Sequence, residues 1–328
     1  MEGDKFEEQK KLATIIKSIH QELRNSAVEL GAEKAWSSHL EDKEKLELYA
    51  NSMRELSERH WKERNSSADD RIQWIIKSCD EYFQEEVLEN HRKKEMQILE
   101  KLLSEEGHSI DMEVNFTMKI TDKLKVIDVG SSGNFFKDSS RFDILPIDIA
   151  PSSDDVFFCD FLSVALSSEL TVESMKIRSL PKNHFDVAIF SMLLEYLPTS
   201  EMRVSCCEKA YEILKTEGIL CIITPDSNSQ HKNAQQIKAW KWTLAKMGFK
   251  RVKVEKLTNL SCMVFRKALS EQVSKRWADF CKETYAYQLE IPQDRLKVSL
   301  SDDTTHDTNL EKKDFEFNIH DMQELPFQ

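Results

Sequence analysis

Acidic side chains recur in the middle of the chain, each at the end of a short apolar run. Asp128 is the next-to-last residue of "VIDV", Asp148 closes "LPID" and Asp160 closes "FFCD". In an open α/β sheet, ligands bind beyond the carboxyl ends of the strands, where the strand order reverses. Asp148 lies twenty residues after Asp128, a spacing suited to a carboxylate that accepts hydrogen bonds from both hydroxyls of a ribose. Asp160 and Phe161 could pair with the amino group of an adenine and stack on its ring.

The loop that follows Asp128, "GSSGNFF", lacks the known phosphate-binding patterns. A phosphate-cradling loop needs GxxxxGK[ST], but Phe135 stands at the position of its second glycine. A dinucleotide fingerprint needs GxGxxG, but Ser132 and Phe135 replace its later glycines. What remains is Gly130, suited to a tight turn with the backbone close to a ligand, and Asn134, which tolerates left-handed conformations.

The acids at the strand ends indicate the kind of ligand. A single aspartate at such a position is often only a cap or a turn former. Three of them in order, followed by Ser191 near the end of a fourth run, favour an adenosine ligand without phosphates. Their negative field would also favour a cationic sulfonium or amino group. S-adenosylmethionine meets all of these requirements.

The elements that must position these residues begin at about residue 120. Runs that are apolar at nearly every position are expected of a parallel sheet covered on both faces. Strands that alternate with helices predict a doubly wound α/β domain, a Rossmann-like fold with a mostly parallel sheet. The last two runs are joined by only a few residues, so we expect them to form an antiparallel hairpin at one edge. The runs are "KLKVIDVG", "FDILPIDI", "VFFCDF", "FDVAIFSMLLEYL", "GILCIITPDS", "KRVKVEKL" and "LSCMVFRKA".

The first hundred residues favour helix, because they contain no proline, only two glycines and many Glu, Lys, Arg and Leu residues. Three apolar stripes at helical spacing predict amphipathic helices that form a small bundle. We therefore expect a helical domain at 1–106, an α/β domain at 107–292 and an acidic, largely disordered tail at 293–328. The stripes are Leu12, Ile15, Ile16, Ile19 and Leu23; Leu46, Tyr49, Ala50, Met53 and His60; and Ile72, Ile75, Ile76, Cys79 and Phe83.

The composition argues against several classes of protein. No run approaches the roughly 18 apolar residues that a membrane span needs, and the charged first residues are unlike a secretion signal, so we expect a cytoplasmic or nuclear protein. Seven cysteines without a CxxC pair indicate reduced, mostly buried thiols, and no metal is implied. The formal net charge of −12 makes binding to nucleic acid through a broad basic surface unlikely on electrostatic grounds.

Several motifs together resemble a known family. "VIDVGSSGN", "LPIDIAP", "CDF" and "FDVAIFSMLLEYLP" resemble the cofactor motifs of the Rossmann-type S-adenosylmethionine-dependent methyltransferases. More closely, "DVGSSGN", "IDIAP", "ITPDS", "IPQD" and the earlier "RHWKERNSSADDRIQW" resemble the SAMTOR family. Its members are S-adenosylmethionine sensors that act upstream of the TOR kinase complex and are related to base methyltransferases of large-subunit ribosomal RNA. The resemblance ends at Asp294, and Ser132 replaces the second glycine of general methyltransferases.

The resemblance implies a role for each matching residue. Gly130 matches the glycine of the first cofactor motif, and Asp148 matches the acid that binds the ribose. Asp160 and Phe161 match the pair that reads the adenine, and Ser191 matches the position that faces the methionine part. The candidate ligand-binding residues are Gly130, Asp148, Asp160, Phe161, Ser191, Asp128, Ile149 and Arg71.

The segment "RHWKERNSSADDRIQW" is the candidate for a gate over the ligand. Arg71 could pair with the methionine carboxylate, while His60, Trp61 and Trp74 could close the cleft. Trp74 also lies near an apolar stripe, so it could simply pack in the core.

The function implied by the resemblance is sensing. A sensor of this family would inhibit TOR complex signalling when S-adenosylmethionine is low, and ligand binding would release it from the GATOR and KICSTOR complexes. S-adenosylhomocysteine is also expected to bind. Such a protein would be cytoplasmic and recruited to the lysosomal surface through its partners.

Catalysis is left open, and no catalytic residue is assigned. The fourth strand end reads "SMLL", without the acid or amide that would hold an exocyclic amine. Adenine N1 needs mainly positioning, because its lone pair is already nucleophilic. The alternative is therefore a nucleolar S-adenosylmethionine-dependent RNA (adenine N1) methyltransferase, and a third hypothesis is a scaffold with a vestigial pocket.

Overall fold

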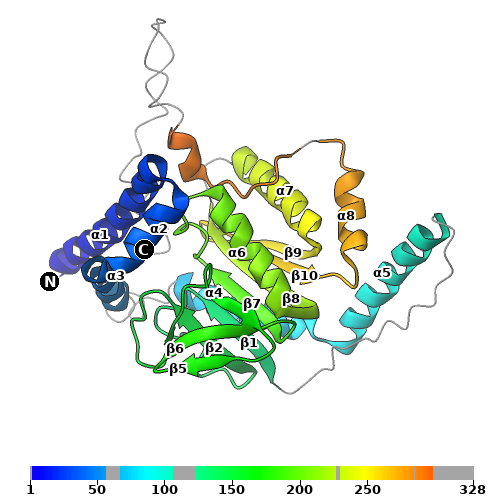
Figure 1. The fold of residues 1–328 in the computed structure, drawn as a ribbon, viewed down its shortest axis with the longest axis horizontal. Helices are drawn as coiled ribbons and strands as arrows, with labels where there is room; N and C mark the ends of the chain where they lie inside the picture. Colours follow the sequence, from blue (N-terminus) through cyan, green and yellow to red (C-terminus); the bar gives the residue numbers. More distant parts are fainter. Residues whose placement is uncertain (1, 57–66, 106–122, 227–229, 284, 298–328) are drawn as a thin grey trace, which may run out of the picture.

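A ten-stranded sheet with helices on both faces forms the centre of the molecule (Figure 1). The computed structural model describes residues 2–56, 67–105, 123–226, 230–283 and 285–297. The strands follow the order β4-β6-β3-β2-β1-β7-β8-β10-β9, and β5 pairs with β6. The strands are β1 (Leu124–Val129), β2 (Phe142–Asp148), β3 (Phe157–Phe158), β4 (Ala165–Ser167), β5 (Thr171–Glu173), β6 (Lys176–Pro181), β7 (Phe185–Ser191), β8 (Leu214–Pro225), β9 (Phe249–Leu257) and β10 (Leu260–Lys267). The helices are α1 (Glu2–Leu30), α2 (Ala32–Glu41), α3 (Lys43–Leu56), α4 (Ser67–Tyr82), α5 (Glu85–Glu105), α6 (Ser200–Ile213), α7 (Gln230–Met247), α8 (Glu271–Asp279) and the 3-10 helix η2 (Pro292–Lys297).

The central strands run parallel, and one edge is antiparallel. β1 pairs in parallel with β2 and β7, and β7 pairs in parallel with β8. Residues of β1, β7 and β8 are buried almost without interruption, because helices cover both faces of the sheet. β10 lies antiparallel between β8 and β9. The predicted α/β sheet and its antiparallel edge hairpin are confirmed.

Helices from different parts of the chain cover the two faces of the sheet. α6 and α7 pack against the face that carries Phe190 and Leu220. α4 and the beginning of α5 pack against the opposite face through Ile75, Tyr82 and Leu88. The layers of the α/β domain therefore include helices that precede residue 107.

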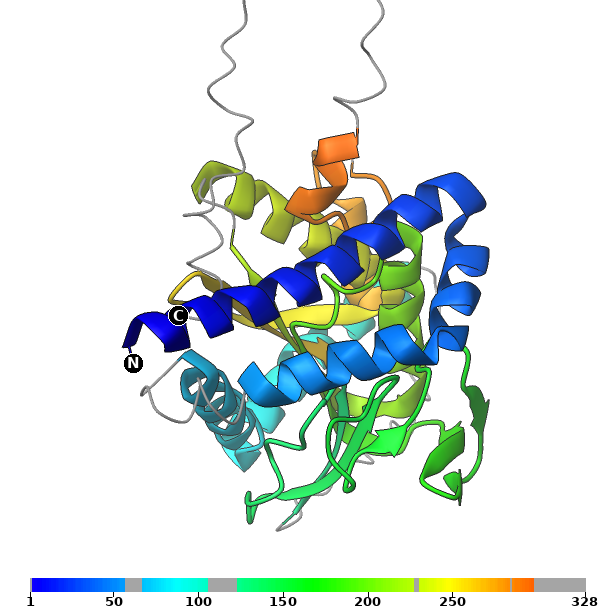
Figure 2. The same cartoon turned by 90° about the vertical axis from the view of Figure 1, so that its left-hand side faces the viewer.

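The helices α1, α2 and α3 form a bundle, here called the helical cap. α1 packs against both α2 and α3, and Figure 2 shows α1 and α3 running alongside each other with the short α2 joining them at one end. A bundle before the sheet is thus confirmed, but its third member is α2. The stripe from Ile72 to Phe83 belongs to α4, which packs on the sheet instead. An amphipathic stripe shows that a face is buried but not which surface buries it.

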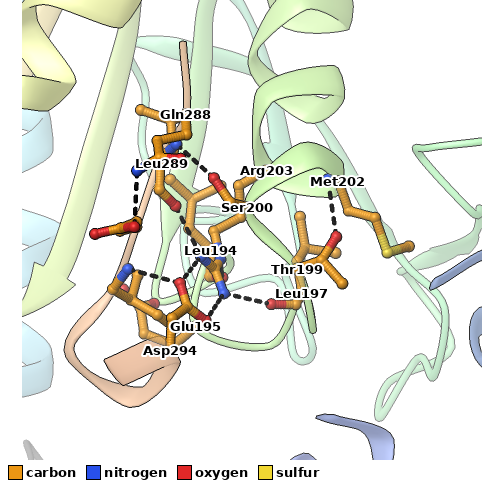
Figure 3. Close-up of polar contacts among 12 residues, drawn as sticks. Leu194, Glu195, Leu197, Thr199, Ser200, Met202, Arg203, Gln288, Leu289 and Asp294 are labelled. Atoms are coloured by element: carbon orange, nitrogen blue, oxygen red, sulfur yellow. Dashed lines mark hydrogen bonds and ion pairs between the residues drawn. The ribbon is translucent and has the colours of Figure 1, made fainter. Parts of the chain in front are cut away.

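The end of the described chain is tied to the body of the protein through Arg203, whose side chain is fully buried. Its Nη1 and Nη2 atoms donate to the Asp294 carboxylate at 2.6 and 2.8 Å. The same guanidinium donates to the carbonyls of Leu194, Leu197 and Leu289 (Figure 3). η2 therefore packs as part of the α/β domain past the predicted boundary at 292. The rest of the tail, 298–328, lies outside the described residues.

The cysteines agree with the expectation of buried thiols. Six of them are buried, and Cys281 is partly exposed. Burial raises the pKa of both Cys206 and Cys207, so these thiols stay protonated and unreactive. Separately, none of the described helices is long and apolar enough to cross a membrane.

Candidate ligand-binding site

A cavity of about 1130 Å³, including its opening to solvent, lies where the carboxyl ends of β1, β2 and β7 meet the helical cap. The strand ends supply its acids, α4 supplies Arg71, and the cap supplies Trp36, Tyr49 and Met53. The wall therefore combines two parts of the chain that are far apart in sequence.

Asp148 lies at the end of β2 and is held by backbone groups. Its Oδ2 accepts from the amide of Ser132 at 2.9 Å, and its Oδ1 accepts from the amide of Ala150 at 2.7 Å. Burial raises the pKa of Asp148, while these amides oppose the shift. Each carboxylate oxygen can accept a second bond. The carboxylate is therefore fixed in place and can still accept hydroxyl donors from a ligand.

Asp160 and Phe161 line the cavity from the segment after β3, the strand next to β2. The Oδ1 atom of Asp160 accepts from the Trp36 indole at 3.3 Å and from the amide of Leu162 at 3.1 Å. Its Oδ2 atom is buried and has no hydrogen-bond partner among the described residues. A buried acceptor left unpaired is unfavourable, so this atom suits a donor on a ligand. Phe161 is buried and packs edge-on against Phe190.

A cation and a carboxyl group meet at the ends of β1 and β7. Arg71 donates through Nη1 to the Ser191 hydroxyl at 3.3 Å, and burial lowers its pKa to about 10. Burial raises the pKa of Asp128 to about 7; Asp148 adds to this shift, whereas Arg71 opposes it. The guanidinium can bind a carboxylate, and Asp128 in its charged form can bind an ammonium or a sulfonium.

The turn after β1 needs residues with positive φ angles. Gly130 has φ +78°, and a Cβ atom there would lie 3.0 Å from Leu193 Cδ1. Ser132 and Asn134 adopt φ of 53° and 49°. Asn134 therefore has the left-handed conformation that the sequence predicts it to tolerate. The left-handed Ser132 stands where general methyltransferases have glycine, and its amide makes the bond to Asp148. The departure from the glycine pattern therefore keeps the geometry of the turn.

All eight residues predicted to bind the ligand line this one cavity. Their role in binding stays a prediction. Trp74, one of the residues predicted to close the cleft, does not line the cavity. It packs against the sheet instead, and its indole donates to Glu255. His60 and Trp61 lie outside the described residues.

The reasoning from sequence missed the aromatic side chains that the cap and the β1 loop contribute. Trp36 and Tyr49 line the cavity from α2 and α3, and Phe135 lines it from the loop after β1. Tyr49 belonged to a predicted apolar stripe, so its burial was expected but not its contact with a cavity. Trp36 is a large aromatic with an indole donor on a short polar helix, and buried groups of this kind usually have a partner.

Comparison with known proteins places the chain among methyltransferase-like proteins. Residues 90–288 match the model of the family described as 25S rRNA (adenine(2142)-N(1))-methyltransferase, Bmt2. The chain is 33% identical over 307 residues to a protein of Danio rerio and 34% identical over 312 residues to one of Xenopus tropicalis. Both are called "S-adenosylmethionine sensor upstream of mTORC1", and the alignments cover 88% of this chain and 77% and 76% of those relatives. The resemblance expected from the motifs is confirmed.

Solved structures are similar only at a distance. An S-adenosylmethionine-dependent methyltransferase from Methanosarcina mazei is 13% identical, with a TM-score of 0.35, over 46% of this chain and 95% of that chain. A score this low adds no argument. The fold assignment rests instead on the order and direction of the strands.

Proposed function

Because the chain belongs to the family that includes Bmt2 and the S-adenosylmethionine sensors upstream of mTORC1, we propose that it binds S-adenosylmethionine and reports its level to TOR signalling. The observation that carries this proposal is that the helical cap and the α/β domain both contribute side chains to the wall of the cavity. Trp36 and Tyr49 of the helical cap face the same cavity as Asp148 and Asp160 of the α/β domain. A ligand that touches both parts favours the arrangement in which they are closed together.

The polar groups of the cavity suit the parts of the ligand in order. The unpaired Oδ2 of Asp160 would accept from the adenine amino group, beside the ring of Phe161. Asp148 would accept from the ribose hydroxyls. Arg71 would hold the methionine carboxylate, and Asp128 would balance the positive end of the ligand. S-adenosylhomocysteine has the same groups except the sulfonium charge, so it is expected to bind as well.

Sensing accounts for the helical cap better than catalysis does. The match to the rRNA methyltransferase model begins at residue 90, after all three cap helices. The alignments with the sensors cover 88% of the chain, too much to leave out all of α1, α2 and α3. We propose that partners bind the form without ligand and are released when S-adenosylmethionine closes the cap, with GATOR- and KICSTOR-type complexes as the expected partners.

Methylation of adenine N1 in RNA is the second candidate, favoured by the match to the Bmt2 model. When bound, S-adenosylmethionine would supply an activated methyl group. Met192 and Leu193 line the cavity after Ser191, and they could position an acceptor but not exchange a proton with it. An acceptor base would also have to enter beside the cap residues.

Calorimetric titration of the full chain with S-adenosylmethionine and S-adenosylhomocysteine tests the binding. Asp148→Asn keeps the shape of the side chain but removes its charge, and we expect at least about tenfold weaker binding from the loss of charge-assisted bonds. Asp143→Asn is the matched control, because Asp143 lies on the same strand but is exposed. No binding by the unmutated chain would refute the sensor and the enzyme alike.

Two assays then separate the candidates. Capture of purified GATOR and KICSTOR complexes by the full chain should decrease when S-adenosylmethionine is added, and Asp148→Asn should make capture insensitive to it. Transfer of a labelled methyl group to ribosomal RNA, with capture unchanged by ligand, would instead support the methyltransferase.

A further inference from the structure

A basic and aromatic surface lies on the side of the α/β domain away from the helical cap, where α7 and α8 pack side by side (Figure 1). This α7–α8 face consists of Lys241, Arg251, Arg276, Trp277 and Phe280. The side chains of Trp277 and Phe280 are 40% and 74% exposed. Large aromatic side chains exposed next to cations are typical of interaction surfaces.

Two cations of the α7–α8 face have no acidic partner among the residues that the structure describes. The Nζ atom of Lys241 lies 3.4 Å from the centre of the Trp277 ring, and burial, together with the nearby Arg251, lowers the pKa of Lys241. Neither Lys241 nor Arg251 forms an ion pair with an acid within the described ranges. Like charges held close together repel each other, so the pair fits a negatively charged partner.

Unlike Lys241 and Arg251, the neighbouring lysines of α7 and α8 have acidic partners. Lys246 pairs with Asp279, and Lys275 pairs with Glu271. The acids near α8 are therefore already engaged with other lysines. The charge of Lys241 and Arg251 is left available to a segment outside the described part of the chain.

The chain itself carries a complementary segment. Residues 301–328 contain eight acids and two lysines, together with Phe315, Phe317 and Phe327. We propose that this C-terminal segment binds the α7–α8 face of its own chain, with carboxylates at Lys241 and Arg251 and phenyl rings at Trp277 and Phe280. The net charge of −12 for the whole chain disfavours nucleic acid as the occupant.

The path of the chain leaves this segment within reach of the face. Trp240 and Thr243 of α7 donate to the carbonyls of Glu290 and Gln288, so this stretch runs along α7 before the described chain ends in η2 on the side of the helical cap (Figure 1). Fourteen further residues lead from Lys297 to Glu311, which as a flexible chain span roughly 20 Å and fully extended about 46 Å. A domain of this size has a radius of gyration of roughly 20 Å. Tethering also gives an effective concentration of about millimolar, so a weak contact suffices.

Zero-length cross-linking of the full chain tests this proposal directly. A carbodiimide joins a lysine to a carboxylate only when the two are in contact, and mass spectrometry identifies the pairs. We expect the acids between Glu311 and Glu324 to be joined mainly to Lys241, and only rarely to the exposed cap lysines Lys34 and Lys43. A mixture of isotopically light and heavy protein distinguishes bonds within one chain from bonds between two copies.

A charge reversal with a matched control completes the test. Arg251→Glu should reduce the yield of links to Lys241 by about fivefold, since an attraction is replaced by a repulsion. Arg178→Glu, at an exposed arginine of β6 near the far edge of the sheet, should leave the yield unchanged. Both sites are exposed, and circular dichroism checks that each variant folds.

Three results would overturn the proposal. Links spread evenly over all exposed lysines would show that the tail has no preferred contact. An equal yield in Arg251→Glu would show that the charge of the face does not attract it. Light-to-heavy links at the share expected for random pairing of the two isotopic forms would assign the face to a second copy. None of these outcomes depends on S-adenosylmethionine, so the proposal stands or falls separately from the sensing function.

Discussion

The buried His20 makes the attachment of the helical cap sensitive to acid. Its ring lies in α1, 4.9 Å from the ring of Tyr196 and 5.8 Å from that of Tyr49, and its Nε2 atom is buried without a hydrogen-bond partner among the described residues. Burial, together with the nearby Arg24 and His39, lowers the pKa of His20 to about 3. The ring must therefore be neutral for the cap to pack as it does.

The size of the effect follows from this pKa. The unfolded value is 6.5 and the folded value is about 3, so the folded state binds fewer protons between these limits. The contribution of His20 to the free energy of unfolding is therefore fully present above pH 6.5 and is lost progressively as the pH falls toward 3. At pH 5 the solution is about 1.5 units below the unfolded pKa, and each unit is worth about 1.4 kcal/mol, so His20 alone accounts for about 2 kcal/mol. His39, whose pKa is lowered to about 4, acts in the same direction.

Urea unfolding at pH 7.5 and pH 5 measures this contribution. We expect His20→Leu to lose about 2 kcal/mol less stability over this interval than the unmutated chain, because the other titrating groups are common to both proteins and cancel in the difference. His184→Leu is the control at a partly exposed histidine away from the cap, and it should change the difference by a much smaller amount. Hydrogen exchange of the α1 amides locates the loss in the cap. Equal losses in His20→Leu and in the unmutated chain would refute the reasoning.

Two further substitutions test the wall of the cavity. Gly130→Ala combines a φ of +78° with a contact at 3.0 Å to Leu193 Cδ1, so we expect a loss of about 1–2 kcal/mol in stability together with weaker ligand binding. The control is Gly31→Ala, at φ +86° in open space, which should lose about as much stability without a change in affinity for the ligand. Thermal unfolding compares the stability of the two variants, and calorimetry compares their affinity. An equal loss of affinity in both variants would contradict a local role for Gly130. Trp36→Phe removes the donor to Asp160 but keeps an aromatic ring. We expect this variant to bind S-adenosylmethionine about three- to tenfold more weakly. An unchanged dissociation constant would show that the bond from Trp36 does not help to orient the Asp160 carboxylate.

The centre of the sheet could be predicted because its strands are buried on both faces. β1, β7 and β8 are buried at almost every position and carry unbroken apolar runs such as "GILCII", which distinguishes them from the amphipathic helices around them. The other edge gave no such signal. β4, β5 and β6 are short or largely exposed, and the segment 165–181 is mostly polar. Edge strands of this kind are stabilised by their backbone pairing and leave little trace in the pattern of hydrophobicity.

The site could be predicted only where the topology of the sheet defines it. Asp128, Asp148 and Ser191 come together because parallel strands end at the same edge. The contact between Trp36 and Asp160 joins residues that are 124 positions apart. No rule of local sequence connects α2 to the end of β3, because that contact depends on how the cap packs after both parts have folded.

The segment after β7 links the cap, the cavity and the end of the described chain. The Arg24 side chain in α1 donates to the carbonyl of Glu195 at 2.9 Å, and the Tyr196 hydroxyl is hydrogen-bonded to His39 in α2. Tyr196 also lines the cavity, while Arg203 holds the carbonyls on either side of these two residues and joins them to Asp294 (Figure 3). A buried ion pair such as Arg203–Asp294 contributes little net stability but loses several kcal/mol when one partner is removed. The bonds of Arg203 thus hold in one position the segment on which the cap packs.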